Sequence, residues 1–219
     1  MMQMDIGEVR DVIVAGWAGR NPADVQHHIA ELEMLGVAPP STVPLFYRVS
    51  ADILTQAENI VVVGEQTSGE AEPVLLRTAT GLYVGIGSDH TDRFCENFSV
   101  ALSKQVCPKV VGTCFWRYED VIGHWDELRL RSYRHEGAQR ILYQEGPLAS
   151  LLRPEKLMHE APMHDGDGLL APGALMFCGT VPAIGGILPT PELTIELVDP
   201  VLGHVLSHRY SVTTLPVVA

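Results

Sequence analysis

The chain has 219 residues, of which 46% are hydrophobic and 19% charged, and its 15 basic and 27 acidic residues give a formal net charge of −12. This length and apolar content predict one domain over residues 1–219, with a core of ordinary size. The net negative charge argues against electrostatic binding of nucleic acid or of an anionic membrane, because both kinds of binding need clustered Lys and Arg.

Cysteine usage and hydropathy indicate the cellular compartment. No two cysteines form a Cys-x-x-Cys pair, and the four lie at Cys95, Cys107, Cys114 and Cys178. The first residues show no basic and apolar leader pattern, and no stretch approaches the ~18 apolar residues that span a bilayer. We therefore expect reduced thiols, a cytoplasmic location and no membrane partner.

The first predicted elements are a strand and a helix within residues 1–41. Residues 12–15 are apolar and mostly β-branched, and they predict a strand that ends at Gly16. Residues 21–24 (Asn-Pro-Ala-Asp) predict a helix start, with Asn at the N-cap and Pro at the first helical position. Apolar residues then recur at helical spacing, and Gly36 predicts the end of this helix.

The rest of the chain is predicted to be strand, interrupted by one helical insertion. Apolar runs separated by glycines predict strands at 60–63, 73–76 and 82–86, and later at 175–177, 193–197 and 205–212. Residues 118–160 predict the insertion. Its first helix contains Trp125, Leu128, Arg129 and Arg131. Its second, shorter helix contains Leu148, Leu151 and Leu152 and ends at Pro154.

Charged residues in this frame suggest a metal site. Glu70 and Glu72 are two positions apart on a predicted strand, so both carboxylates point to the same side. With Asp89 from a following turn, they would form an all-oxygen pocket for a hard cation such as Mg²⁺. His28 and Glu31 lie one helical turn apart and could handle a water molecule.

Each feature also has an ordinary interpretation. Glu70 and Glu72 could form the solvent face of a half-exposed strand, and Asp89 could be a turn former. His28 and Glu31 could be a surface pair worth a few tenths of a kcal/mol. Only their order and spacing together make a specific signal.

That order is similar to a known family. The segments are Gly19-Arg20-Asn21, His28-Ile29-Ala30-Glu31, Pro44-Leu45-Phe46-Tyr47-Arg48, Glu70-Ala71-Glu72, Ser88-Asp89-His90-Thr91-Asp92-Arg93, Ser103-Lys104 and Gly179-Thr180-Val181-Pro182-Ala183-Ile184-Gly185-Gly186. From about residue 16 onward the chain resembles the fumarylacetoacetate hydrolase family, in particular its single-domain acylpyruvate hydrolases. The sequence of several segments is also similar to a bacterial branch of that superfamily catalogued as a domain of unknown function.

The resemblance implies an α+β fold: a mixed β-roll of the fumarylacetoacetate hydrolase C-terminal-domain type, with a short N-terminal lid helix. It also implies a homodimer. Mg²⁺ or Mn²⁺ would be held by Glu70, Glu72 and Asp89. The implied catalytic residues are His28, Glu31 and Lys104, and those that hold the substrate are Arg48, Arg93, Gly179 and Thr180.

The implied activity is hydrolysis of a C–C bond in a small anionic keto acid of the acylpyruvate type, through an enolate that the metal and Lys104 stabilise. The same enolate arises in decarboxylation and tautomerisation, so both reactions stay open, and a non-catalytic binding protein is a further alternative. Departures from the family pattern include Asp92 in place of Ala, which would add negative charge by the metal, and Glu96 where many members have Gln. These changes argue for a substrate other than an ordinary acylpyruvate.

Overall fold

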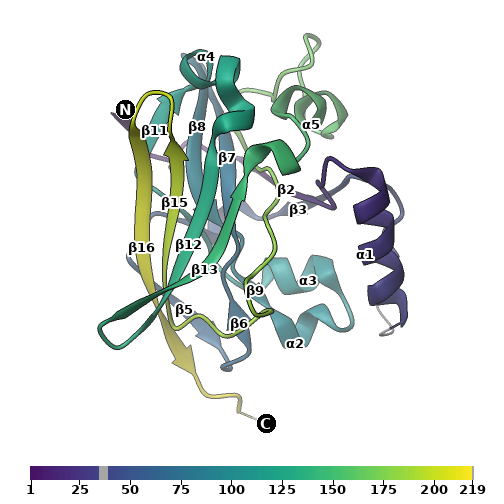
Figure 1. Ribbon diagram of the computed structural model, residues 1–219, viewed down its shortest axis with the longest axis vertical. Helices are drawn as coiled ribbons and strands as arrows, with labels where there is room; N and C mark the ends of the chain where they lie inside the picture. The colour runs from purple at the N-terminus through teal and green to yellow at the C-terminus, as the bar shows by residue number, and fades with distance from the viewer. Residues whose placement is uncertain (35–38, 219) are drawn as a thin grey trace.

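Two β-sheets pack against each other, with short helices at one side and at one end (Figure 1). The computed structural model describes residues 1–34 and 39–218, and the side chains of His28, Glu31 and Leu32 lie outside the described part. The predicted helix is α1 (Pro22–Met34), and the glycine expected to end it, Gly36, is outside the described residues.

The larger sheet has nine strands, and its main path runs in the order β1-β11-β8-β7-β14-β2-β3. Their bounds are Met2–Gln3, Cys114–Arg117, Gly81–Ser88, Ala71–Thr78, Ala174–Phe177, Asp11–Gly16 and Leu45–Val49. β10 (Lys109–Val111) pairs with β8 and also with β4 (Leu54–Thr55). The sheet is mixed, because β14 runs parallel to β2 while β7 and β8 are antiparallel.

The second sheet has the order β13-β12-β15-β16-β5. Its strands are Gln139–Pro147, Arg129–Glu136, Glu192–Asp199, His204–Leu215 and Asn59–Val63. A separate two-stranded sheet joins β6 (Thr67–Ser68) to β9 (Thr91–Asp92).

The short helices fall into two groups. Near β9 and β3 lie α2 (Arg93–Glu96) and α3 (Val100–Gln105). The other helices are η1 (Ala51–Ile53), α4 (Tyr118–Val121), η2 (Ile122–Glu127), η3 (Leu148–Ser150) and α5 (Pro154–Glu160). Among the described residues, no helix is long and apolar enough to cross a membrane.

The core explains why β7, β8 and β14 are nearly continuous apolar runs. One face of these strands packs on the second sheet, where Leu75, Val84 and Met176 are fully buried. The other face forms a second cluster that includes Val74 and Phe177. A strand that is buried on both faces has no reason to alternate polar and apolar residues.

The strands predicted in 12–15, 60–63, 73–76, 82–86, 175–177, 193–197 and 205–212 are confirmed. The helix predicted through Arg129 and Arg131 is wrong, since η2 ends at Glu127 and the chain continues into the hairpin β12–β13. Leu130 and Ser132 are buried while Arg129 and Arg131 are partly exposed, which is the period of a strand.

The second predicted helix is also displaced. Leu148–Ser150 forms only a 3-10 turn, and Pro154, which was expected to end a helix, begins α5. Proline suits that first helical position because the missing N–H would have had no partner there.

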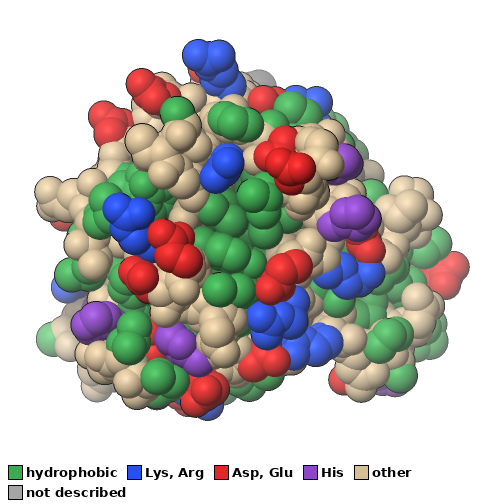
Figure 2. All heavy atoms as spheres, turned by 90° about the horizontal axis from the view of Figure 1, so that it is seen from above, with side chains coloured by type: hydrophobic (Ala, Val, Ile, Leu, Met, Phe, Trp, Pro, Cys, Tyr) green, Lys and Arg blue, Asp and Glu red, His purple; other side chains and the backbone are tan. Residues whose placement is uncertain are grey.

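The end of the molecule that carries α4 and α5 has a mixed surface. Viewed from above, hydrophobic side chains gather at its centre and charged side chains surround them (Figure 2). An open cavity of about 460 Å³ is lined by residues of α4, η2, α5 and the segment after α5, among them Tyr118, Ile122, Met158 and Leu169. None of the predicted site residues whose side chains the structure describes lines this cavity.

Candidate metal centre and its surroundings

The three predicted carboxylates come together at one end of β7 and β8. Antiparallel pairing sets Ala71 opposite Ser88, so Glu70, Glu72 and Asp89 meet where the two strands join their loops. The Asp89 N–H donates to the Glu70 carbonyl at 3.0 Å. One oxygen from each carboxylate lies within 4.8 Å of the others. Three hard oxygen donors at this separation fit Mg²⁺ or Mn²⁺.

Asp89 is held by two lysines. The Lys104 ammonium, on α3, contacts Asp89 Oδ2, and Lys109 Nζ lies 3.0 Å from Asp89 Oδ1. Burial would raise the pKa of Asp89, but the charges of Lys104 and Lys109 outweigh burial and hold the pKa below its usual range. A carboxylate has about four lone-pair sites, so two lysine contacts still leave room for a cation.

Glu72 is in the opposite electrostatic position. Its side chain is 3% exposed, and its Oε2 accepts a hydrogen bond from the Gly179 N–H at 2.7 Å. Burial first, and then the negative charge of Asp89, raise the pKa of Glu72 well above its ordinary value. A cation among the three carboxylates would relieve this repulsion, which is why the residues present fit a metal.

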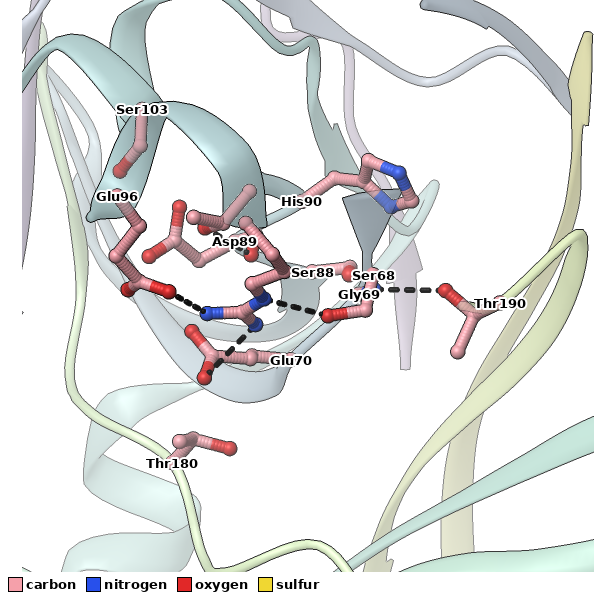
Figure 3. Close-up of polar contacts among 12 residues, drawn as sticks. Ser68, Gly69, Glu70, Ser88, Asp89, His90, Glu96, Ser103, Thr180 and Thr190 are labelled. Carbon is pink, nitrogen blue, oxygen red and sulfur yellow. Dashed lines mark hydrogen bonds and ion pairs between the residues drawn. The ribbon is translucent and has the colours of Figure 1, made fainter. Parts of the chain in front are cut away.

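Arg93 packs beside Glu70 rather than pointing into open space. Its Nε donates to Ser68 Oγ at 2.7 Å, its Nη1 donates to Glu96 Oε2 at 2.8 Å, and its Nη2 lies 3.1 Å from Glu70 Oε1 (Figure 3). All three nitrogens of the guanidinium are therefore engaged. This arrangement orients Glu70, and Glu96 shares the cation with it.

His90, next to Asp89, belongs to a buried polar network. Its Nδ1 lies 3.0 Å from the Tyr210 hydroxyl, its Nε2 lies 2.9 Å from Thr67 Oγ1, and Tyr210 also bonds Ser88 Oγ at 2.8 Å. Burial, and then the positive charge of Lys109, lower the pKa of His90 to about 3. The imidazole is therefore neutral at physiological pH.

The loop after β14 contributes Gly179 and Thr180. Gly179 has φ +94, and a Cβ there would lie 2.7 Å from Ala18 Cβ. A glycine is therefore needed to aim this N–H at Glu72. The Thr180 hydroxyl donates to the Ala71 carbonyl at 2.8 Å and accepts from Gln144 Nε2 at 2.7 Å.

Arg48, which the resemblance implies at the substrate, pairs with an acidic residue of the neighbouring strand. Its Nη2 lies 2.6 Å from Asp11 Oδ1, in an exposed pair on neighbouring strands. The adjacent Tyr47 faces the site instead, with Lys104 Nζ 5.7 Å from the centre of its ring. Asp92 caps α2 by accepting the Cys95 N–H at 2.9 Å, and its carboxylate is not one of the three that converge.

The other predicted residues lie on α1. His28 and Glu31 are helical residues, one turn apart as predicted, but their side chains are outside the described part of the chain. The role of His28 and Glu31 in activating a water molecule therefore stays a prediction.

Sequence reasoning did not find Lys109, Tyr47 or Gln144. Lys109 opens a short β-branched strand after Pro108, and a lysine at that point could signal a buried ion pair. Tyr47 lies in the segment 44–48, in which the resemblance implies a role only for Arg48. Gln144 gave no signal, because its partners lie on segments far away in the sequence.

Solved structures identify the fold. A 2-keto-3-deoxy-D-arabinonate dehydratase complexed with magnesium and 2,5-dioxopentanoate matches with a TM-score of 0.61 at 13% identity, over 95% of this chain and 74% of that chain. A maleylpyruvate hydrolase from Sphingobium sp. SYK-6 matches with a TM-score of 0.60 at 14% identity, over 94% and 71%. A 4-oxalocrotonate decarboxylase from Pseudomonas putida G7, complexed with calcium and acetate, matches with a TM-score of 0.55 at 15% identity, over 94% and 78%.

These likenesses confirm the predicted α+β fold with mixed sheets. A comparison with curated proteins finds no match. The sequence matches the family described as protein of unknown function DUF2848 over residues 15–210, and the chain belongs to that family.

Proposed function

We propose that this protein is a Mg²⁺- or Mn²⁺-dependent enzyme that hydrolyses a C–C bond in a small keto acid related to the acylpyruvates. The observation that carries the proposal is the convergence of Glu70, Glu72 and Asp89 within 4.8 Å of one another, with the Lys104 ammonium on Asp89. A cation at these carboxylates would act as a Lewis acid on the keto oxygens of the substrate.

Residues around the three carboxylates would each have a separate role in the reaction. The buried ammonium of Lys104 can donate a hydrogen bond to the oxygen that gains negative charge as the C–C bond breaks and pyruvate leaves as its enolate. Arg93 orients Glu70, and the Gly179 N–H orients Glu72. Thr180, whose proton is directed at Ala71 and whose oxygen already accepts from Gln144, can use its remaining lone pair to accept a hydrogen bond from a bound water.

Water activation is assigned to α1. We propose that His28, oriented by Glu31, accepts a proton from the water that adds to the distal carbonyl of the substrate. The C–C bond then breaks, the water oxygen remains in the released carboxylic acid, and a proton on the enolate carbon completes pyruvate. Following the resemblance, we also propose a homodimer, which sedimentation analysis of the purified protein tests.

Decarboxylation or tautomerisation of a keto acid is the second candidate. Both reactions build the same enolate, so they would use the same buried cation at Lys104. Structures that share this fold at 13–15% identity include a dehydratase, a hydrolase and a decarboxylase, so the fold does not choose between reactions.

Metal binding is the first test. We expect Mn²⁺ to bind the purified protein saturably in calorimetry, and oxalate, which mimics the enolate of pyruvate, to tighten it. At 100 times its Kd, the metal should stabilise the fold by about 2.7 kcal/mol. Glu72→Gln removes one of three ligands and should weaken binding by at least ~100-fold, since outer partners alone contribute ~10–100-fold.

Glu119→Gln is the matched control, because Glu119 is an exposed acid on α4. If wild type binds no Mn²⁺, or if both variants bind alike, the metal-dependent mechanism is wrong. Turnover in H₂¹⁸O then separates the reactions. Hydrolysis places ¹⁸O in the released acid, decarboxylation releases CO₂, and tautomerisation leaves the substrate mass unchanged.

A further inference from the structure

Gln144 is a buried residue of β13, in the second sheet, whose side chain reaches the carboxylate cluster's backbone. It is 1% exposed. Its Oε1 accepts from the Ala71 N–H at 3.0 Å and from Ser132 Oγ at 2.8 Å. Its Nε2 donates to Thr180 Oγ1 and to the Val181 carbonyl, each at 2.7 Å. An amide has two acceptor sites and two donor hydrogens, so all four are used.

The partners fix the orientation of this amide. The Ala71 N–H can only donate and the Val181 carbonyl can only accept, so Oε1 and Nε2 cannot be exchanged. Because Nε2 donates to Thr180, the Thr180 proton is free to go to the Ala71 carbonyl, 2.8 Å away. The Ala71 peptide groups are thus held on both sides, directly by Gln144 and through Thr180.

These contacts bring together the parts of the site that the sequence keeps apart. Ala71 lies between Glu70 and Glu72 and is the first residue of β7. Thr180 and Val181 follow Gly179, whose N–H donates to Glu72 Oε2. One side chain therefore ties the segment that bears the carboxylates to the loop that orients one of them.

We propose that Gln144 is the positioning residue of this site, which holds residues 70–72 and 179–181 as one unit. Its effect on metal affinity rests on the proposed function, whereas its effect on the two segments does not. The hairpin β12–β13 thereby gains a role in the site, through a side chain whose four hydrogen bonds all go to protein groups.

The test compares three variants by hydrogen–deuterium exchange of the metal-free full-length protein. Gln144→Met keeps the length of the side chain and removes all four hydrogen bonds, so peptides covering 69–75 and 178–184 should exchange at least ~10-fold faster. Gln144→Glu keeps the acceptor toward Ala71 and loses both donors, so only 178–184 should accelerate strongly. Ser132→Ala removes the second hydrogen bond to Gln144 Oε1 and leaves the bonds to Ala71, Thr180 and Val181, so both peptides should stay within ~2-fold of wild type.

Mn²⁺ titration is the second measurement. Gln144→Met should weaken binding by about 10- to 100-fold, while Ser132→Ala keeps the wild-type affinity. The proposal is overturned if Gln144→Met leaves the two peptides unchanged, or if it accelerates exchange equally across the whole chain. If wild type itself binds no Mn²⁺, the proposed function fails, and the exchange pattern still decides the role of Gln144.

Discussion

Replacing Lys109 by methionine should destabilise the protein strongly. Lys109 is fully buried, its Nζ lies 3.0 Å from Asp89 Oδ1, and it also donates to the His90 carbonyl. Methionine keeps the length and apolar stem of the side chain, so the main change is the loss of the ammonium group. Asp89 would then be a buried carboxylate with Lys104 as its remaining cation.

The expected magnitude follows from the burial of both partners. Removing one member of a buried ion pair costs about 3–5 kcal/mol. Because Lys104 still compensates Asp89, we take the lower end, about 3 kcal/mol. For a chain of this size, 1 kcal/mol corresponds to about 2–4 °C, so the Tm should fall by roughly 6–12 °C.

Urea and thermal unfolding at pH 7 measure this change, with Lys156→Met as the control. Lys156 forms an exposed pair with Glu160 one helical turn away, which contributes less than about 0.5 kcal/mol. The pKa of Asp89 is lowered on folding, so the ion pairs stabilise fully above the unfolded pKa of 3.8 and progressively less below it. The difference between wild type and Lys109→Met should therefore shrink below about pH 4. If wild type and Lys109→Met unfold with the same free energy at pH 7, the reasoning is refuted.

Two further predictions concern the surroundings of the cluster. Folding lowers the pKa of His90 from 6.5 to about 3. Between these pH values the unfolded chain binds more protons than the folded chain. The contribution of His90 to the free energy of unfolding is therefore complete above pH 6.5 and is lost as the pH falls. Between pH 7 and pH 5 this loss is roughly 2 kcal/mol. Urea unfolding of His90→Gln should not show the loss. If the free energy of unfolding falls equally with pH in wild type and His90→Gln, the lowered pKa of His90 is contradicted. Gly179→Ala should cost about 1–3 kcal/mol, because φ +94 is strained with a Cβ that would also meet Ala18 at 2.7 Å. Gly137→Ala is its control, since it has positive φ with nothing within 4 Å, and equal Tm losses in the two would show that the contact with Ala18 is unimportant.

The sequence was a good guide wherever the information is local. Continuous apolar runs predicted β7, β8 and β14, because strands covered on both faces need no alternation. The spacing of Glu70 and Glu72 predicted carboxylates on one side of a strand, and the two do converge with Asp89. The charged residues of the hairpin β12–β13 are compatible with a helix surface, but Leu130 and Ser132 alternate with them as in a strand, so the helix prediction is wrong there.

Only the tertiary structure decided which partners each carboxylate meets. Gly179 lies 107 residues from Glu72, and Gln144 lies 73 residues from Ala71. Side-chain periodicity specifies which face of a strand a residue occupies, but not which distant strand lies beside that face. The sequence by itself therefore predicted the three carboxylates that converge at the candidate metal centre, and the packing of the two sheets determined how they are held.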